Sequence, residues 1–419
     1  MKTVEKINYR IEHDEAVILT AEEFKQRVRK GEDISMDDVD VVTTATCGIM
    51  SGTAAVLTVP VSEKGEFDRA KMVWLNDIPA LPGPCPNERL GLVDLIIYGT
   101  AHSTSKPMEY GAGHLFRDFV EGKEIDIKVE TDDNRFVKNS IKLDSLDFAR
   151  ILTTRSCFKN YSAFVNTKEG EVKTIFSVLG LMGPDKEVTV SGCGEINPLE
   201  NDPDLKTMGI GTKVLVNGSI GYIIGKGTRS SKVKPNLSVI ADMFDMKPEF
   251  MGGFKTSFGP ECITSIAVPI PILDEGILSN LKILDEDVSL PVADINDRTP
   301  FYEASYGDVW KEKSRSVTFD NKICVNHGDC IVEEICPTNA FSLRDGGIDK
   351  KRCFNCGSCI SLCLEGAFFG KLGAIRINGK DVPIKLRQSN RHMANLLALR
   401  LKRMIIKKEF LLSKPVDRL

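Results

Sequence analysis

Long apolar runs are missing from this chain of 419 residues. No stretch approaches the roughly eighteen uninterrupted apolar residues of a membrane-spanning helix. The charged segment 1–14 has no apolar core of a signal peptide. The net charge of −4 is too small to predict binding to nucleic acid or to membranes. Neither a Walker pattern nor a dinucleotide-binding glycine pattern occurs, so we expect no ATP or dinucleotide.

What is present is an ordinary soluble composition, with 42% hydrophobic and 27% charged residues. The length predicts two or three domains. Mixed helix and strand signals predict an α/β or α+β N-terminal domain over 1–285, and a polar segment at 286–316 predicts a linker. A small ferredoxin-like domain of the bacterial 4Fe-4S type is expected over 317–370, followed by a hairpin and a basic helix over 371–419.

Seven of the twelve cysteines lie between Cys324 and Cys363. The second half of this block is C-x2-C-x2-C-x3-C, formed by Cys353, Cys356, Cys359 and Cys363, and this is the ligand pattern of bacterial-type ferredoxins. In such ferredoxins the fourth cysteine of each run serves the other cluster. Cys353, Cys356, Cys359 and Cys336 are therefore predicted to hold one 4Fe-4S cluster.

The first half of the block is irregular, because Cys324, Cys330 and Cys336 are spaced C-x5-C-x5-C. This leaves Cys324, Cys330 and Cys363 for a second cluster, 4Fe-4S or 3Fe-4S, with His327 as the candidate fourth ligand. The alternative is that His327 is a polar loop residue and that the second cluster is absent. Thiols without an export signal indicate a reducing cytoplasm.

Three further cysteines are candidate catalytic thiols. Cys47 and Cys193 each follow a short β-branched run and precede glycine, which predicts a strand end and, at Cys47, the start of a helix. A helix N-terminus stabilises the thiolate and lowers the pKa of the cysteine. Cys157 lies in a segment rich in cations and polar side chains. The alternative for each is a buried, unreactive cysteine.

Candidate anion-binding residues lie on either side of Cys157 and in a later glycine-rich turn. Residues 144–152 predict a helix, after which Arg155 and Lys159 would share a helical face and hold a small anionic substrate. Arg229 lies in the turn Gly225-Lys-Gly-Thr-Arg229, whose N–H groups and cations suit a carboxylate, phosphate or sulfonate. The alternative is a solvated basic patch.

Several other segments carry expectations about structure. Thr20 with Glu23 forms a capping-box pattern at the start of a helix, and Asn217-Gly218 and Asn378-Gly379 each predict a hairpin turn. Residues 266–272, with prolines at 269 and 271, predict an edge strand. Residues 391–410 predict a basic helix, which could dock an acidic, low-potential electron donor or pack against the cluster domain.

The first 280 residues resemble the homocysteine-biosynthesis sulfur-incorporation family, the archaeal L-aspartate-semialdehyde sulfurtransferases. The resemblance is carried by an ordered series of blocks: Val41-Val-Thr-Thr-Ala-Thr, Trp74-Leu-Asn-Asp, Glu109-Tyr-Gly-Ala-Gly-His114, Gly122-Lys-Glu-Ile-Asp126, Lys159-Asn-Tyr, Ser191-Gly-Cys-Gly-Glu-Ile-Asn-Pro198, Asn201-Asp-Pro-Asp204 and Gly209-Ile-Gly-Thr. With its ferredoxin-like block, the whole chain is similar to the methanogenesis marker 16 metalloprotein branch. The family's cysteine-bearing segment before the Asn-Tyr block is represented here by Thr131–Asn134, which has no cysteine.

The resemblance implies an enzyme that converts a small anionic aldehyde to a thiol, using a sulfide or persulfide donor and low-potential electrons. The implied pairs are sulfoacetaldehyde with coenzyme M, or aspartate semialdehyde with homocysteine. Cys47 is the first candidate for the reacting thiol, followed by Cys193 and Cys157. The alternatives are an electron-transfer subunit whose large domain binds a partner, or an iron–sulfur carrier. A homo-oligomer is a further expectation.

Overall fold

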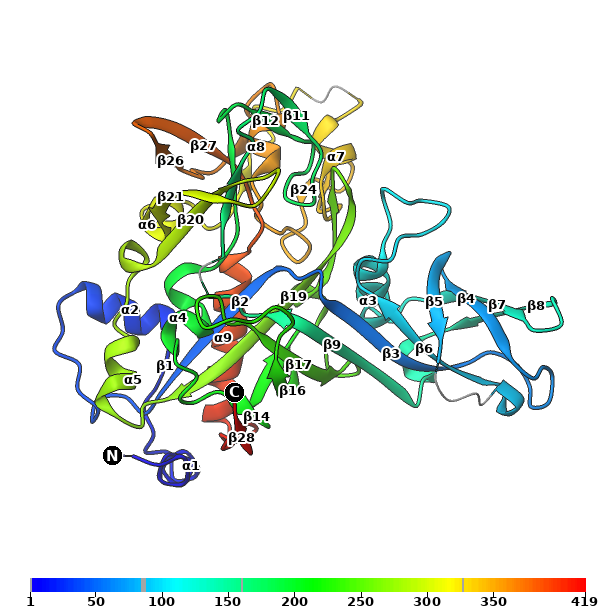
Figure 1. Cartoon of the computed structure of the whole chain (residues 1–419), viewed down its shortest axis with the longest axis horizontal. Helices are drawn as coiled ribbons and strands as arrows, with labels where there is room; N and C mark the ends of the chain where they lie inside the picture. The colour runs from blue at the N-terminus through cyan, green and yellow to red at the C-terminus, as the bar shows by residue number, and fades with distance from the viewer. Residues whose placement is uncertain (1, 84–87, 160, 326–327) are drawn as a thin grey trace.

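The computed structural model describes residues 2–83, 88–159, 161–325 and 328–419. It is a mixed α/β structure in which large sheets dominate and helices are few and mostly short (Figure 1). The helices of the described ranges are α1 (Val4–Glu12), α2 (Ala21–Arg29), α3 (Ala112–Val120), α4 (Pro198–Asn201), α5 (Glu275–Asn280), α6 (Tyr306–Trp310), α7 (Ile331–Ile335), α8 (Ser358–Leu362) and α9 (Arg391–Ile406).

One long sheet of fourteen strands, counted over the described residues, runs across the molecule in Figure 1. Its order is β1-β2-β19-β15-β16-β17-β9-β3-β6-β5-β4-β7-β8, and β18 pairs with β19. The strands are β1 (Ile18–Thr20), β2 (Val41–Ile49), β3 (Thr53–Pro60), β4 (Ala70–Leu75), β5 (Ile78–Pro82), β6 (Leu92–Tyr98), β7 (Ile125–Thr131), β8 (Phe136–Ile141), β9 (Phe148–Ser156), β15 (Lys213–Val216), β16 (Ser219–Lys226), β17 (Leu237–Asp242), β18 (Gly252–Thr256) and β19 (Gly259–Pro271).

A second sheet has six strands within the same described ranges, in the order β21-β20-β10-β13-β27-β26. Two of its strands and helix α6 come from 286–316, the segment for which a linker was predicted. The strands are β10 (Ala163–Val165), β13 (Val188–Val190), β20 (Ser289–Asp294), β21 (Pro300–Ser305), β26 (Ala374–Ile377) and β27 (Lys380–Arg387).

The remaining strands form two-stranded pairs. The pairs are β11 (Gly170–Val172) with β12 (Leu181–Gly183), β14 (Gly209–Ile210) with β28 (Asp417–Arg418), β22 (Thr318–Phe319) with β25 (Phe368–Phe369), and β23 (Phe341–Ser342) with β24 (Gly347–Ile348). The last two pairs, with α7 and α8, enclose a small core of Val317, Val332, Phe341, Ala367 and Phe368. A separate ferredoxin-like domain over 317–370 stays a prediction.

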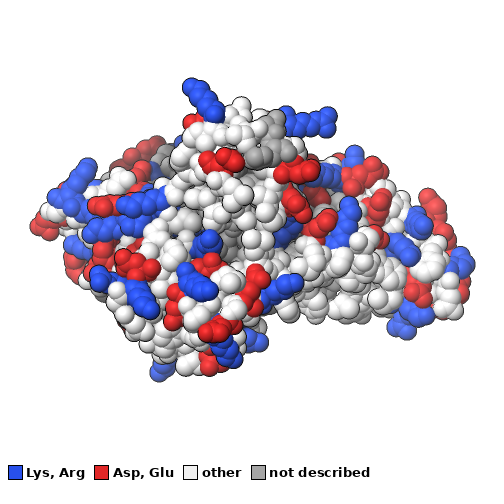
Figure 2. All heavy atoms as spheres, turned by 90° about the horizontal axis from the view of Figure 1, so that it is seen from above, with Lys and Arg blue, Asp and Glu red and all other residues white. Residues whose placement is uncertain are grey.

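Helix α9 packs against β1, β2 and β19 of the long sheet, and its apolar face includes Leu397 and Leu401 (Figure 1, red). The basic helix predicted at the C-terminus is therefore confirmed, but its apolar face covers a sheet of the N-terminal region. On the face seen in Figure 2, basic and acidic side chains are interspersed. Within the described ranges, no helix is long and apolar enough to cross a bilayer.

Several local predictions are confirmed. Thr20 and Glu23 form the reciprocal capping box that starts α2. The Asn-Gly turns at Asn217 and Asn378 join β15 to β16 and β26 to β27, and both asparagines adopt positive φ. These signals succeed because they depend on a few neighbouring residues.

The predicted helix at 144–152 is wrong, because most of this segment belongs to strand β9. Burial alternates along the strand, with Ala149 and Ile151 buried while Phe148 and Arg150 are exposed. β9 pairs with β3 on one side and β17 on the other. Pairing with two distant strands overrides the local helix preference.

The strand predicted at 266–272 is present over 266–271, where it belongs to β19 and pairs with β2. It is not an edge strand throughout, because β15 pairs with Ile266 and Ala267 on the other side. The prolines at 269 and 271 lie beyond the pairing with β15, where the strand has one partner and tolerates residues that lack an N–H donor.

Candidate active site

The ends of β2, β9 and β16 meet at an open hollow that contains two of the predicted anion-binding residues. The backbone of Thr154 joins the segments: its N–H donates to the Gly52 carbonyl at 2.8 Å, and its carbonyl accepts from the Thr228 N–H at 2.7 Å. Arg155 and Arg229 thereby line one hollow. The other lining residues are Ile49, Met50, Ser51, Gly52, Phe158, Tyr161 and Thr228.

The two arginines are held differently. The Arg155 guanidinium carbon lies 5.0 Å from the centre of the Phe158 ring, and its buried Nε has no hydrogen-bond partner among the described residues. Arg229 is exposed and adopts a positive φ of 59°. Lys159 is not among the lining residues, and its backbone N–H donates to the Pro235 carbonyl at 3.2 Å. No helix aligns Lys159 with Arg155, because Arg155 lies in β9.

Cys157 lies in a narrower cavity that adjoins this hollow and shares Ile49, Met50, Phe158 and Tyr161 with it. The thiol residue is 1% exposed and adopts a positive φ of 53°. Positive φ is uncommon for a residue with a Cβ atom, and such conformations gather at functional sites. All three predicted catalytic thiols lie in the described part of the chain. Of these three, Cys157 alone lines this cavity.

Cys47 and Cys193 pack together in the core beneath α9. The Cys193 Sγ lies 3.8 Å from the Cys47 carbonyl oxygen and 3.7 Å from Thr46 Oγ1. The helix predicted after Cys47 does not exist, because Cys47 lies within β2 and the chain turns directly into β3. Cys193 precedes a single three-residue 3-10 turn, Gly194–Ile196.

Burial raises the pKa of all three thiols. This corrects the expectation that a helix N-terminus lowers the pKa of Cys47, because a mid-strand residue has no convergent, unpaired N–H groups. All three residues therefore remain thiols at neutral pH unless a bound group changes their surroundings.

A charged network holds the turn that contains Cys193. Arg391, at the start of α9, donates to Asp285 at 2.6 Å and to Glu195 at 2.9 Å, and all three side chains are at most 2% exposed. Arg29 donates to both Glu195 oxygens, at 2.7 and 2.6 Å. Burial opposes ionisation of Glu195, but these guanidiniums outweigh it and lower its pKa to about 2.

Four cysteines of the C-terminal block surround a second, mostly apolar cavity. They are Cys336, Cys353, Cys356 and Cys359, the four predicted to hold one 4Fe-4S cluster. Burial raises the pKa of Cys353 to about 11 and of Cys356 to about 12. A thiolate is unfavourable in this apolar environment unless its negative charge is neutralised, and bound iron would neutralise it.

No three His, Cys, Asp or Glu side chains of the described residues converge closely enough to hold one metal ion. A cubane cluster uses a different geometry, because each of its four irons takes its own sulfur ligand. The four cysteines that line this cavity match the number of protein ligands that such a cluster requires. Cys324, Cys330 and Cys363 border the small core of the block, whereas His327 lies outside the described residues, so the second cluster stays a prediction.

Segment 387–390 lies between the ring of four cysteines (Cys336, Cys353, Cys356 and Cys359) and the thiol cavity, which is the cavity that contains Cys157. The sequence did not reveal this connecting role. On one side, the Arg387 N–H donates to the Cys356 carbonyl at 3.0 Å, and Asn390 Nδ2 donates to the Cys353 carbonyl at 3.3 Å. On the other, Ser389 lines the cavity that contains Cys157, and its hydroxyl accepts from the Gly192 N–H at 2.7 Å. The available signal was Asn390 itself, a helix-capping residue directly before the basic helix.

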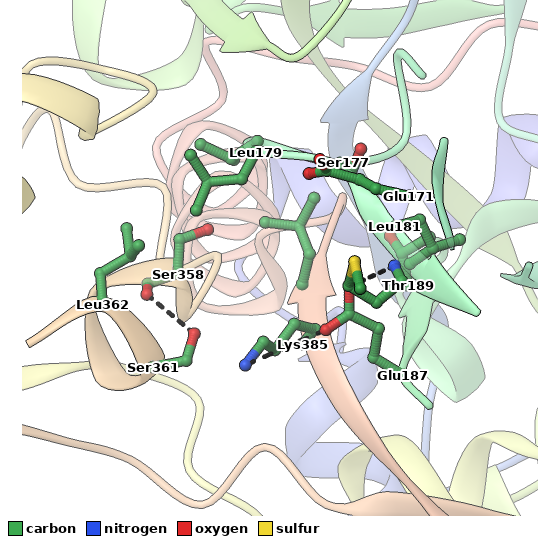
Figure 3. A pocket seen from close by; sticks show the side chains of 14 residues that line it. Glu171, Ser177, Leu179, Leu181, Glu187, Thr189, Ser358, Ser361, Leu362 and Lys385 are labelled. Atoms are coloured by element: carbon green, nitrogen blue, oxygen red, sulfur yellow. Dashed lines mark hydrogen bonds and ion pairs between the residues drawn. The ribbon is translucent and has the colours of Figure 1, made fainter. Parts of the chain in front are cut away.

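A further hollow lies where α8 approaches β27 and the β11–β12 pair (Figure 3). Ser358 and Ser361 of α8 face Lys385 and Glu187 across it, and the last two form a loose ion pair at 4.0 Å. The Ser358 hydroxyl also lies 3.6 Å from Cys356 Sγ. None of the predicted site residues lines this hollow, but Ser358 connects it to the cysteine ring.

Comparison with known proteins supports the class of enzyme that this arrangement of thiols and cations suggests. The family described as "Homocysteine biosynthesis enzyme, sulfur-incorporation" matches residues 16–412, nearly the whole chain. The protein belongs to this family and is an enzyme. The match also encloses the C-terminal cysteine block.

The relatives are archaeal. An uncharacterised protein of Methanothermobacter thermautotrophicus is 47% identical over 411 residues, which cover 98% of this chain and 94% of that protein. The L-aspartate semialdehyde sulfurtransferase of Methanocaldococcus jannaschii is 34% identical over 310 residues, covering 70% of this chain and 58% of the relative. The enzyme of the same name from Methanosarcina acetivorans is 30% identical, covering 77% and 64%. No solved structure matches the chain.

Proposed function

We propose that this protein is an iron–sulfur sulfurtransferase that converts a small anionic aldehyde to the corresponding thiol. The observation that carries the proposal is the shared wall of two cavities: Arg155 and Arg229 line one, Cys157 lines the other, and Phe158 and Tyr161 line both. A cation pair thus lies next to a thiol, as a substrate with an anionic end and a reactive carbonyl end requires.

The chemistry balances in three steps. Sulfide adds to the aldehyde and gives a thiohemiacetal, loss of water gives a thioaldehyde, and two electrons with two protons give the thiol. Arg155 and Arg229 bind the substrate anion, since guanidinium groups pair bidentately with carboxylate, sulfonate or phosphate oxygens. Cys157 lies at the position proposed for the carbonyl and orients the incoming sulfide there.

A 4Fe-4S cluster held by Cys336, Cys353, Cys356 and Cys359 would supply the electrons one at a time. The chain's own contribution is to place this ring next to the thiol cavity through segment 387–390. Free thiols and such a cluster require a reducing compartment, so a cytoplasmic location belongs to the proposal.

Two substrates are considered, sulfoacetaldehyde and aspartate semialdehyde. Within the described residues, the lining of the two cavities contains arginines but no Asp or Glu side chain. An amino-acid substrate carries an ammonium group that an acidic partner would stabilise, whereas sulfoacetaldehyde carries only an anion. The lining therefore favours sulfoacetaldehyde, with coenzyme M as the product.

The test is an anaerobic assay of the reconstituted full-length protein with sulfide, a low-potential reductant and each aldehyde. Thiol formation is measured by derivatisation and mass spectrometry, with acetaldehyde as the control aldehyde that lacks an anion. We expect a thiol product that requires the reductant, and little product from acetaldehyde. Absence of thiol product from every aldehyde, in protein that holds reducible clusters, would favour an electron-transfer subunit or a cluster carrier.

A further inference from the structure

Glu261 is a buried carboxyl next to the arginine-lined hollow. It lies near the start of β19, is 6% exposed, and its Oε2 has no hydrogen-bond partner among the described residues. Across the strand pair it faces Phe254 of β18. An ionised carboxylate in such surroundings is strongly disfavoured. Burial accordingly raises the pKa of Glu261.

β2 pairs antiparallel with β19, and the Met50 N–H donates to the Cys262 carbonyl at 2.8 Å, so the neighbouring residues Ser51 and Glu261 lie close together. The Ser51 side chain lowers the pKa of Glu261, but by less than burial raises it. Ser51 is exposed, lies in the turn between β2 and β3, and lines the hollow with Arg155 and Arg229. The hydroxyl therefore connects a buried carboxyl to the space proposed for the substrate.

Within the described part of the chain, no ion pair joins Glu261 to the arginines of the hollow or to the cations of β18 and α3. Lys255 of β18 donates to the Glu334 carbonyl at 3.0 Å, and Arg117 of α3 donates to Glu121 at 2.8 Å.

Tyr161 lines the hollow, and burial raises its pKa, so this phenol is neutral as well. Cys262 follows in the same strand, and burial raises its pKa to about 12. On α3, which packs against β18 and β19, burial lowers the pKa of His114 to about 4, so this histidine is neutral at physiological pH.

We propose that Glu261 is held protonated and delivers its proton through Ser51 to the hydroxyl group that leaves when the thiohemiacetal becomes a thioaldehyde. In this step the C–O bond breaks and the hydroxyl departs as water with the proton from the relay. The C=S bond forms as the S–H proton is lost, and that proton returns to the Glu261 carboxylate, so the step is redox-neutral. The assignment rests on the proposed function, and Glu261 is a positioning residue that acts through Ser51.

The test compares the wild-type protein with Glu261→Gln, Glu261→Asp and Ser51→Ala. Removing a general acid reduces turnover by about 10²–10⁴-fold. We expect Glu261→Gln and Ser51→Ala to lose at least about a hundredfold in kcat, with unchanged iron content and aldehyde affinity, and Glu261→Asp to recover part of the loss. Wild-type kcat should fall as pH rises and the acid form is lost, whereas the Glu261→Gln profile should lack this descending limb.

A second measurement does not depend on turnover. The infrared spectrum at neutral pH should show the C=O stretch of a protonated carboxyl that is missing in Glu261→Gln and shifted in Ser51→Ala. Absence of that band in the wild-type protein overturns the inference whether or not any thiol is formed. So does a Glu261→Gln variant that keeps its kcat and pH profile. If Glu261→Gln fails to fold, the exposed Ser51→Ala substitution carries the kinetic test alone.

Discussion

Replacing Arg391 by methionine should destabilise the protein strongly, because it leaves buried charge without a partner. Asp285 would lose its short ion pair, and Arg29, its other ion-pair partner among the described residues, lies 3.9 Å away and is one-third exposed. Glu195 would keep the bidentate contact with Arg29. Removing one partner of a buried ion pair costs about 3–5 kcal/mol. We expect a loss in that range for Arg391→Met.

The loss should also depend on pH in a defined direction. Burial already raises the pKa of Asp285 in the native protein, and removal of the Arg391 cation raises it further. A carboxyl whose pKa is higher in the folded state stabilises the fold at low pH, and this contribution is lost as pH rises through the folded-state pKa. The deficit of Arg391→Met should therefore be smaller near about pH 5 than near about pH 8.

The assay is urea-induced unfolding of anaerobic protein followed by circular dichroism at both pH values. Arg403→Met is the matched control, because Arg403 is an exposed position on the same helix. A second variant combines Arg391→Met with Asp285→Asn, which removes the stranded charge and should recover part of the loss. A difference of less than about 1 kcal/mol between Arg391→Met and the exposed control would refute the reasoning, since surface substitutions stay within that range.

Three further predictions concern the two proposed sites. Arg229→Met should raise KM for an anionic aldehyde by about 10–150-fold, because a charge-assisted hydrogen bond contributes about 1.5–3 kcal/mol. KM for acetaldehyde, which has no anion, should not change. Equal effects on both aldehydes would contradict anion binding by Arg229. Cys157→Ala should abolish sulfide-dependent turnover. Cys262→Ala is the control, because Cys262 is a buried thiol outside both cavities, and this variant should retain turnover. If both variants retain turnover, Cys157 has no role in the chemistry. Ser358→Ala should make the reduction potential of the cluster more negative in an EPR-monitored titration, because hydrogen bonds to ligand sulfurs raise this potential. Ser361→Ala is the control and should match the wild type, because the Ser361 hydroxyl donates to a backbone carbonyl at 3.1 Å.

The sequence was informative where a few neighbouring residues decide the outcome. The capping box at Thr20 and the Asn-Gly turns are such cases, since their hydrogen bonds and φ angles are local. The cysteine spacing predicted which four sulfurs gather, and Cys336, Cys353, Cys356 and Cys359 do line one cavity. The cluster itself stays a prediction.

Tertiary structure decided the candidate active site. Sequence reasoning placed Cys47 at a helix start and 144–152 in a helix, and both predictions were wrong because strand pairing determines these segments. β9 pairs with β3 and β17, and this brings Arg155 beside Ser51 and Arg229 from loops that are distant in sequence. Glu261 carried no local signal at all, because its unusual environment arises from burial by other strands. Residue spacing in the cysteine block thus predicted which sulfurs line one cavity, whereas the positions of the thiol, cations and acid depend on long-range hydrogen bonding between strands.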